Sequence, residues 1–108
     1  GTVDVVGVDP GRAEGITGFR KVCERVEAAG RQANAHAWSS AIVSAASLAM
    51  SFSTPVCHQF EVKPLRNPMQ HDLVTHPLDH ADGWMALPSQ PGLGIEVVEE
   101  VVNRYRSS

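Results

Sequence analysis

The sequence predicts an α/β protein with a parallel sheet, and three patterns support this prediction. A short, nearly continuous apolar run at residues 2–8 is typical of a strand covered on both faces. A helical pattern follows it, and a second helix-forming segment comes after the next short stretch. A third strand-like segment occupies residues 56–62. Strands that alternate with helices pair in parallel through right-handed crossover connections.

The first unit consists of a strand over residues 2–8 and the helix after it. The turn-forming sequence Asp9-Pro10-Gly11 ends the strand. Beyond it, apolar residues recur at spacings of three and four, which places them on one face of a helix. We expect Thr17 to cap this helix and Gly30 to end it. The apolar face consists of Phe19, Val22, Cys23, Val26 and Ala29.

The second unit is a short strand over residues 33–36 followed by a helix over residues 41–50. Ser39 or Ser40 supplies the expected cap, and the small residues of this helix allow it to pack closely on a sheet. Thr54-Pro55 then interrupts the helix, because the residue before a proline avoids the helical conformation. The third strand, over residues 56–62, is rich in branched and aromatic residues.

The character of the sequence changes after the third strand. Residues 63–83 contain three prolines and no sustained periodicity, so we expect an irregular connection with one short helical turn. A short strand over residues 84–87 and a turn-rich loop over residues 88–94 follow. The last element is a terminal amphipathic helix over residues 96–105, and its apolar face consists of Val97, Val98, Val101, Val102 and Tyr105.

Length and composition exclude several classes of protein. A chain of 108 residues and 11.6 kDa has room for one modest domain. The formal net charge is −3 and basic residues are scattered, so we expect no nucleic acid and no membrane among its partners. No membrane span or signal peptide is recognised, and we expect a cytoplasmic protein. Cys23 and Cys57 are expected to be free, buried thiols.

Three polar side chains lie at the ends of the predicted strands. Asp9 lies at the end of the first strand, His36 at the end of the second and Glu61 near the end of the third. They are 27 and 25 residues apart, close to the roughly 30 residues of one strand–helix unit in an eight-stranded barrel. The carboxyl ends of parallel strands meet at one edge of a sheet, where ligands bind. We therefore expect the three side chains to converge.

These residue types suit acid–base chemistry. In an Asp9–His36 dyad, the carboxylate would fix the tautomer of the imidazole for a role as acid or base. Glu61, between Phe60 and Val62, suits a carboxyl group that stays protonated in apolar surroundings and donates a hydrogen bond to a developing oxyanion. Each residue also has a simpler interpretation: a turn residue, a structural histidine and an exposed charge, respectively.

Several motifs together resemble one known family. The run from Asp4 to Gly18 is followed by Asn34-Ala35-His36-Ala37-Trp38 and then by His58-Gln59-Phe60-Glu61. Asp82-Gly83-Trp84 and the run from Pro91 to Glu96 complete the pattern. In this order the motifs resemble the C-terminal part of the mandelate racemase branch of the enolase superfamily, within the mandelate racemase/muconate lactonizing enzyme family. The resemblance covers essentially the whole chain.

The resemblance implies the C-terminal portion of a modified (β/α) TIM-type barrel. Residues 1–62 would supply strands six to eight with their helices. Residues 63–108 would form the C-terminal connection, a short strand and a terminal helix that packs toward the capping domain. The remaining barrel polypeptide would be a partner of this chain, and we expect a homo-oligomer. One departure is Glu14-Gly15, where the family often has paired glycines; Arg12 is the expected partner of Glu14.

The resemblance also implies a reaction. In the family, a sixth-strand Asp and a seventh-strand His form a dyad that moves the proton next to a substrate carboxylate, and an eighth-strand Glu hydrogen-bonds the enediolate. Asp9, His36 and Glu61 fall on these positions. In the family, Mg²⁺ is held by acidic residues at the ends of the third to fifth barrel strands. The 108 residues of this chain do not include those strands, so we expect no metal ligand in it.

Within the family, we expect dehydration of a small-molecule carboxylate, an acid sugar, to a 2-keto-3-deoxy acid. Two alternatives stay open: a racemase or epimerase of a 2-hydroxy acid, and an inactive barrel fragment that needs the remaining chain. Trp38 is a candidate substrate-binding residue, although packing is an equal alternative. Trp84 is expected to pack. His71, His76 and His80 match no tight zinc-ligand spacing, so a solvated loop is expected there.

Overall fold

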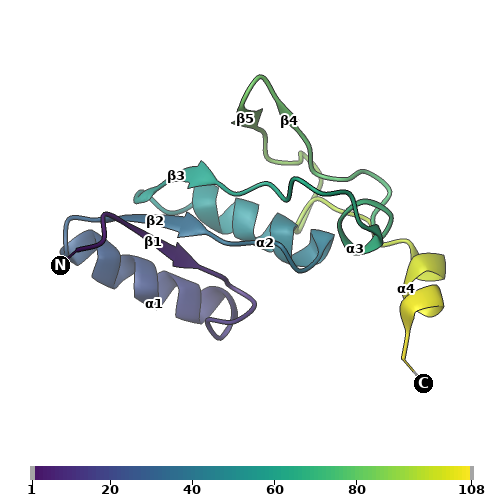
Figure 1. Ribbon diagram of the computed structural model, residues 1–108, viewed down its shortest axis with the longest axis horizontal. Coiled ribbons are helices and arrows are strands. Elements are labelled where there is room, and N and C mark those ends of the chain that lie inside the picture. The colour runs from purple at the N-terminus through teal and green to yellow at the C-terminus, as the bar shows by residue number, and fades with distance from the viewer. Residues whose placement is uncertain (1, 108) are drawn as a thin grey trace.

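The computed structural model describes residues 2–107, which form a three-stranded sheet, a two-stranded hairpin and four helices (Figure 1). The strands β1, β2 and β3 pair in parallel and in chain order, which confirms the predicted α/β class. The elements in order are β1 (Val5–Val8), α1 (Gly15–Ala28), β2 (Gln32–Ala35), α2 (Ala41–Phe52), β3 (Cys57–Phe60), α3 (Pro68–His71), β4 (His80–Ala81), β5 (Trp84–Met85) and α4 (Glu99–Tyr105).

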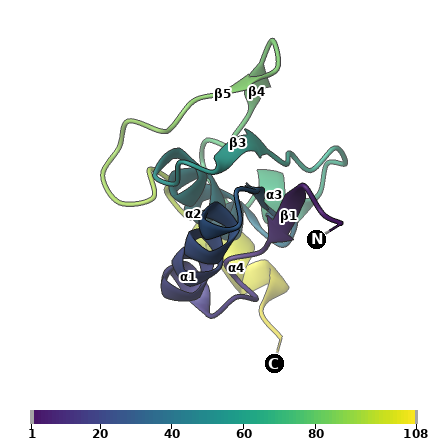
Figure 2. The same cartoon turned by 90° about the vertical axis from the view of Figure 1, so that its left-hand side faces the viewer.

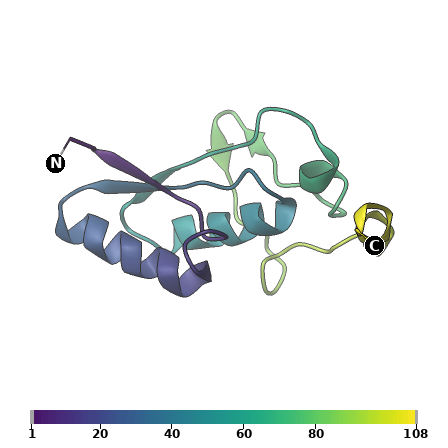
Figure 3. The ribbon, with the colours of Figure 1, turned by 60° about the horizontal axis from the view of Figure 1, so that its bottom comes forward.

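The two long helices cover one face of the sheet (Figure 3). Helix α1 contacts β1 and β2, and α2 contacts β2 and β3. Alternate side chains of a strand point to opposite faces, so Ala33 and Ala35 pack against the helices while Asn34 and His36 belong to the other face. The core between sheet and helices consists of Val8, Phe19, Cys23, Val26, Ala33, Ala35 and Met50.

Helix α1 begins three residues earlier than the sequence predicts. Its first residue is Gly15, and the residue before it, Glu14, has left-handed backbone angles of φ 60° and ψ 35°. Gly15 also has a positive φ of 75°. Thr17 therefore does not cap the helix. Two consecutive positive φ angles explain why paired glycines suit this turn, and why a glutamate at the first position is strained.

Helix α2 matches the prediction closely at its start. It begins at Ala41, and the Oγ of Ser40 accepts a hydrogen bond from the backbone N–H of Val43 at 3.4 Å. This is the geometry of an N-cap, which satisfies one of the unpaired N–H groups of the first turn. The helix continues two residues beyond the predicted end, to Phe52.

The C-terminal segment contains the predicted single helical turn, α3, capped by the side chain of Asn67. Asp82 and Gly83, with φ angles of 52° and 81°, connect the antiparallel strands β4 and β5 in a tight hairpin. Figures 1 and 2 show this hairpin standing away from the helices. Trp84 is 79% exposed on it, so the expectation that Trp84 packs is wrong for the described chain.

The terminal helix is shorter than predicted. Helix α4 begins at Glu99, because the residues before it run antiparallel to residues 73–75: Val74 and Val97 form a bridge, and the N–H of Val98 donates to Leu73 O at 2.8 Å. Of the predicted apolar face, only Val101 is buried. Within residues 2–107, no helix combines the length and apolarity that crossing a membrane requires.

Candidate active site

The candidate residues meet where the parallel strands end. Pairing of β1 with β2 puts Val8 beside Ala35, and the next backbone N–H, that of His36, donates to Val8 O at 2.8 Å. Asp9 follows Val8 directly, so Asp9 and His36 leave neighbouring strands side by side. Glu61 follows the last residue of β3. The structure thus brings all three residues to one edge of the sheet.

Glu61 is the carboxylate that contacts the histidine. The Nδ1 of His36 lies 2.6 Å from Glu61 Oε2, and the other carboxylate oxygen, Oε1, accepts a hydrogen bond from Asn34 Nδ2 at 3.1 Å. The side chains of His36 and Glu61 are 42% and 36% exposed, so the pair is partly open to solvent. The surroundings of Glu61 are therefore polar, unlike the apolar setting that the sequence suggested.

The contact fixes the tautomer of the imidazole. When Glu61 is ionised, its carboxylate only accepts hydrogen bonds, and Nδ1 of His36 then carries the proton that points to Glu61. In the neutral ring, Nε2 then holds the lone pair and can accept or return a proton. This is the arrangement of an oriented general acid–base, in which the carboxylate also stabilises the imidazolium that forms.

A bulge in the sheet places Glu61 opposite His36. Ala33 of β2 lies opposite Cys57, but Ala35 lies opposite Phe60, so β3 uses three residue steps where β2 uses two. With regular pairing from Cys57, the residue next to His36 would be Phe60. The extra residue therefore brings the carboxylate to the histidine, as bulges near active sites often re-aim a side chain.

Asp9 points into its own turn rather than to the histidine. Its Oδ1 accepts a hydrogen bond from the backbone N–H of Gly11 at 2.7 Å, and Oδ2 lies 3.9 Å from Arg12 Nε. The expected Asp9–His36 dyad is thus replaced by the His36–Glu61 contact, because Gly11 and Arg12 satisfy the Asp9 carboxylate locally. The expected Arg12–Glu14 pair is likewise replaced by Arg12 and Asp9.

Trp38 lies beside the histidine on the same side of the chain. Its ring centroid is 5.5 Å from that of His36, and the two planes are inclined by 33°. The indole is 42% exposed, and the Nζ of Lys63 donates to the Trp38 carbonyl oxygen at 3.1 Å. Trp38 therefore shields one side of the imidazole and still presents an open surface beside it.

Asn34 is a site residue that the sequence reasoning missed. It lies two residues before His36 on β2, so the alternation of strand side chains puts both on the same face. That spacing is the signal that would have identified it. Its Nδ2 binds Glu61, while its buried Oδ1 has no partner within the described residues. Asn34 thus helps to hold the carboxylate that orients His36.

A hollow of about 990 Å³ borders this group, and its walls include Asn34, Phe60, Glu61, His80 and Trp84. It lies between β3 and the β4–β5 hairpin. A volume of this size suits a small molecule. The exposed Trp84 forms part of its wall.

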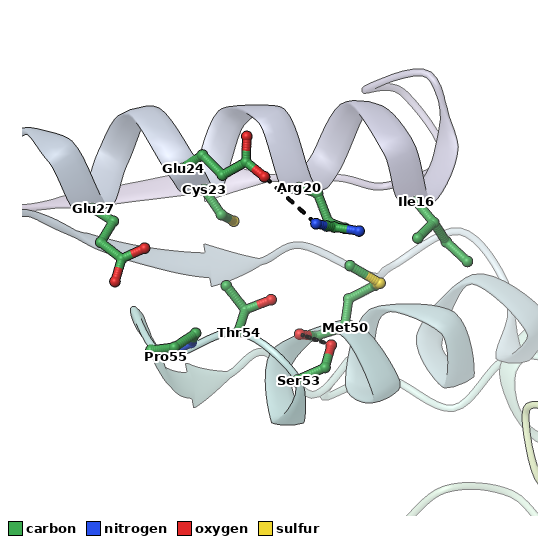
Figure 4. A pocket seen from close by; sticks show the side chains of 9 residues that line it. All are labelled: Ile16, Arg20, Cys23, Glu24, Glu27, Met50, Ser53, Thr54 and Pro55. Atoms are coloured by element: carbon green, nitrogen blue, oxygen red, sulfur yellow. Dashed lines mark hydrogen bonds and ion pairs between the residues drawn. The ribbon is translucent and has the colours of Figure 1, made fainter.

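A second hollow, of about 450 Å³, lies on the helical side of the sheet (Figure 4). Helix α1 contributes Arg20 and Glu24, which form an ion pair at 3.6 Å, and the segment after α2 contributes Thr54 and Pro55. It includes none of the candidate site residues. Cys23 also lines it.

Both cysteines are free thiols, as predicted, but only Cys23 is buried; Cys57 is half-buried. Burial, together with the neighbouring Cys57, raises the pKa of the Cys23 thiol from 9.0 to about 12. Burial also raises the pKa of Cys57. Neither thiol is therefore an activated nucleophile, which would need a lowered pKa.

The described residues do not form a metal centre. In residues 2–107, no three His, Cys, Asp or Glu side chains are placed to hold one metal ion. His71, His76 and His80 do not converge: the Nδ1 of His71 contacts the backbone at Asn67, and that of His76 contacts Thr75 Oγ1. The donor set of this chain therefore does not fit a magnesium site of its own.

Comparison with known proteins establishes the family. Residues 1–101 match the model of the enolase C-terminal domain-like family, so the chain belongs to this family. Over 108 residues it is 29% identical to the D-gluconate dehydratase of Thermoproteus tenax. The match covers 99% of this chain and 22% of the relative.

Solved structures agree with this assignment. A candidate mandelate racemase from Bordetella bronchiseptica RB50, complexed with 2-oxoglutarate/phosphate, superposes with a TM-score of 0.90 at 27% identity, over 98% of this chain and 29% of that one. A candidate dehydratase from Salmonella enterica serovar Typhimurium gives a TM-score of 0.89 at 26% identity, over 99% and 27%. The chain thus spans less than a third of the length of these relatives.

Proposed function

We propose that this chain forms part of an enzyme that abstracts the proton alpha to a carboxylate with the help of Mg²⁺, and that the reaction is the dehydration of an acid sugar to a 2-keto-3-deoxy acid. The contact between His36 Nδ1 and Glu61 Oε2 at 2.6 Å carries the proposal, because it orients an acid–base imidazole at the ligand-binding edge of a parallel sheet. The similarity to a D-gluconate dehydratase supports the dehydratase assignment.

In this proposal His36 is the acid that protonates the departing β-hydroxyl, which leaves as water. The alpha proton would pass to a base outside this chain, and its loss together with that of the hydroxyl gives an enol, which tautomerises to the 2-keto-3-deoxy acid. Glu61 keeps Nδ1 protonated and stabilises the imidazolium, Asp9 shapes the adjacent turn, and Trp38 lines the substrate side of the ring. The magnesium ion would be held by residues outside this chain, where it would stabilise negative charge on the substrate.

The alternative function is racemisation or epimerisation of a 2-hydroxy acid. In that case His36 Nε2 would remove and return the alpha proton itself. The similarity to a candidate mandelate racemase favours this alternative. Both functions need the remaining barrel polypeptide, since β1 and β3 each have one unpaired edge in the three-stranded sheet.

The complete polypeptide, screened against acid sugars with detection of 2-keto products, tests the proposal. His36→Asn should abolish turnover and leave the affinity for magnesium nearly unchanged. His76→Asn, which changes an exposed histidine of the C-terminal connection, is the matched control and should keep full activity. Retained turnover in His36→Asn would remove His36 from the mechanism.

Two results would redirect the proposal. Racemisation without a keto product would favour the alternative reaction. A native protein that consists solely of a species of 11.6 kDa, as measured by mass spectrometry, would favour an inactive fragment.

A further inference from the structure

A buried polar cluster joins the C-terminal connection to the end of β2. The Nε2 of Gln70, in α3, donates to the carbonyl oxygen of Ala37 at 3.1 Å. The Oγ of Ser44, in α2, donates to the same oxygen at 2.7 Å and lies 2.9 Å from Gln70 Oε1. All three residues are buried, with exposures of 9% for Gln70, 7% for Ser44 and 1% for Ala37.

This cluster fixes the chain between two residues of the candidate site. Ala37 lies between His36 and Trp38, and the preceding carbonyl, that of His36, accepts a hydrogen bond from Ser47 Oγ at 3.4 Å. Gln70 is itself held, because its backbone N–H donates to Asn67 Oδ1 at 3.1 Å. A buried glutamine is uncommon unless its amide is hydrogen-bonded. The side-chain amide of Gln70 has its two contacts, with Ala37 O and Ser44 Oγ, inside this cluster.

We propose that Gln70 is a positioning residue for His36. By holding the Ala37 carbonyl, it fixes the direction in which the backbone leaves β2, and thereby the placement of the imidazole between Glu61 and Trp38. The inference rests on the proposed function for its catalytic consequence. It assigns a role in the site to α3, through its hydrogen bond to the residue that follows His36.

Two variants of nearly equal size separate the hydrogen bonds of Gln70 from its volume. In the complete protein, Gln70→Met keeps the volume and removes the hydrogen bonds, whereas a protonated Gln70→Glu can still donate to Ala37 O and keep an oxygen beside Ser44 Oγ. We expect Gln70→Met to lower kcat by about 10- to 100-fold with KM changed less than about threefold, because small misplacements of a catalytic group are costly. Gln70→Glu should restore most of kcat.

A spectroscopic readout tests the inference without turnover. The near-UV circular dichroism of Trp38 depends on its placement beside His36, and subtracting the spectrum of Trp38→Phe isolates it. Gln70→Met should change this signal and Gln70→Glu should keep it. Val26→Ala is the control, because Val26 is similarly buried, at 7% exposure, in the core between α1 and the sheet; it should lower stability and leave kcat and the Trp38 signal intact.

The outcomes distinguish this inference from the proposed function. If Gln70→Met lowers stability but keeps kcat and the Trp38 signal, Gln70 is only structural and the inference is wrong. If Gln70→Met fails to fold, Gln70→Ala removes the same hydrogen bond to Ala37 O without overfilling the site, and an unchanged Trp38 signal in that variant would also refute it. If His36→Asn retains turnover, the proposed function fails, whereas the Trp38 signal still decides whether Gln70 positions the end of β2.

Discussion

The turn after β1 approaches helix α1 closely at Gly18. A Cβ atom at Gly18 would lie 1.6 Å from the carbonyl oxygen of Ala13 and 2.7 Å from its carbonyl carbon. Because real Cβ atoms essentially never approach within 3.0 Å, Gly18→Ala must separate these groups by at least 1.4 Å, the difference between 3.0 and 1.6 Å. The oxygen belongs to the backbone and cannot rotate away, so the turn or the helix has to move.

The cost of Gly18→Ala follows from two opposing effects. Alanine favours a helix interior over glycine by about 1 kcal/mol. Overpacking costs about 1–3 kcal/mol or more, and a collision with backbone lies at the upper end of this range. We expect a net loss of about 1–2 kcal/mol. Turnover should fall as well, since the N–H of Ala13 donates to Asp9 O at 2.9 Å, so displacement of the turn moves Asp9.

Thermal unfolding and kcat of the complete protein test this prediction. Each kcal/mol corresponds to about 2–4 °C in Tm for a domain of 150–250 residues. Thr17→Ala, at an exposed neighbouring helix position, is the control and should leave kcat unchanged without lowering Tm. A Gly18→Ala protein with the parental Tm and kcat would show that the close approach does not constrain this turn.

Three further predictions concern other parts of the molecule. Asn34→Asp puts a second carboxylate about 3 Å from Glu61 Oε1, and the repulsion should lower kcat about tenfold or more. Glu14→Gly should raise the free energy of unfolding by up to about 1 kcal/mol, because it relieves a left-handed backbone at the expense of some chain entropy. Because the pKa of Cys23 rises to about 12 on folding, its contribution to stability is full below about pH 9 and is lost toward pH 12. Chemical denaturation should show this alkaline loss, and Cys23→Ala should weaken it.

The sequence predicts the layered part of the fold well because local chemistry determines it. The apolar stripe of α1 and the serine cap of α2 depend on residue spacing and on one hydroxyl, both of which the sequence contains directly. Helix α4 is predicted less well. Val97 and Val98 continue its apolar pattern, but their backbone groups pair with residues 73–75 instead, and this competing partner is distant in the sequence.

In the candidate site, the sequence predicts which residues come together but not which of them form contacts. Strand spacing predicts that Asp9, His36 and Glu61 reach one edge of the sheet, and they do. Which carboxylate contacts the imidazole depends on the bulge between β2 and β3, which shifts the register by one residue. No composition or periodicity signal in the four residues of β3 reports that extra step. The same register brings Asn34 to Glu61, which is why this contact was also missed.

The carboxylates of Asp9 and Glu61, both at the edge of the sheet, differ in their hydrogen-bond partners. For Asp9 to contact His36 through Oδ1, it would have to give up the 2.7 Å hydrogen bond from Gly11, and a hydrogen bond to a charged group contributes about 1.5–3 kcal/mol. Contact through Oδ2 would give up the 3.9 Å contact with Arg12 instead. Glu61 already contacts His36 and loses nothing. An arrangement that pairs Oδ1 of Asp9 with the histidine must therefore recover this energy from groups outside the turn, such as a bound substrate. Without that compensation, Glu61 orients the imidazole and Asp9 holds the turn that borders it.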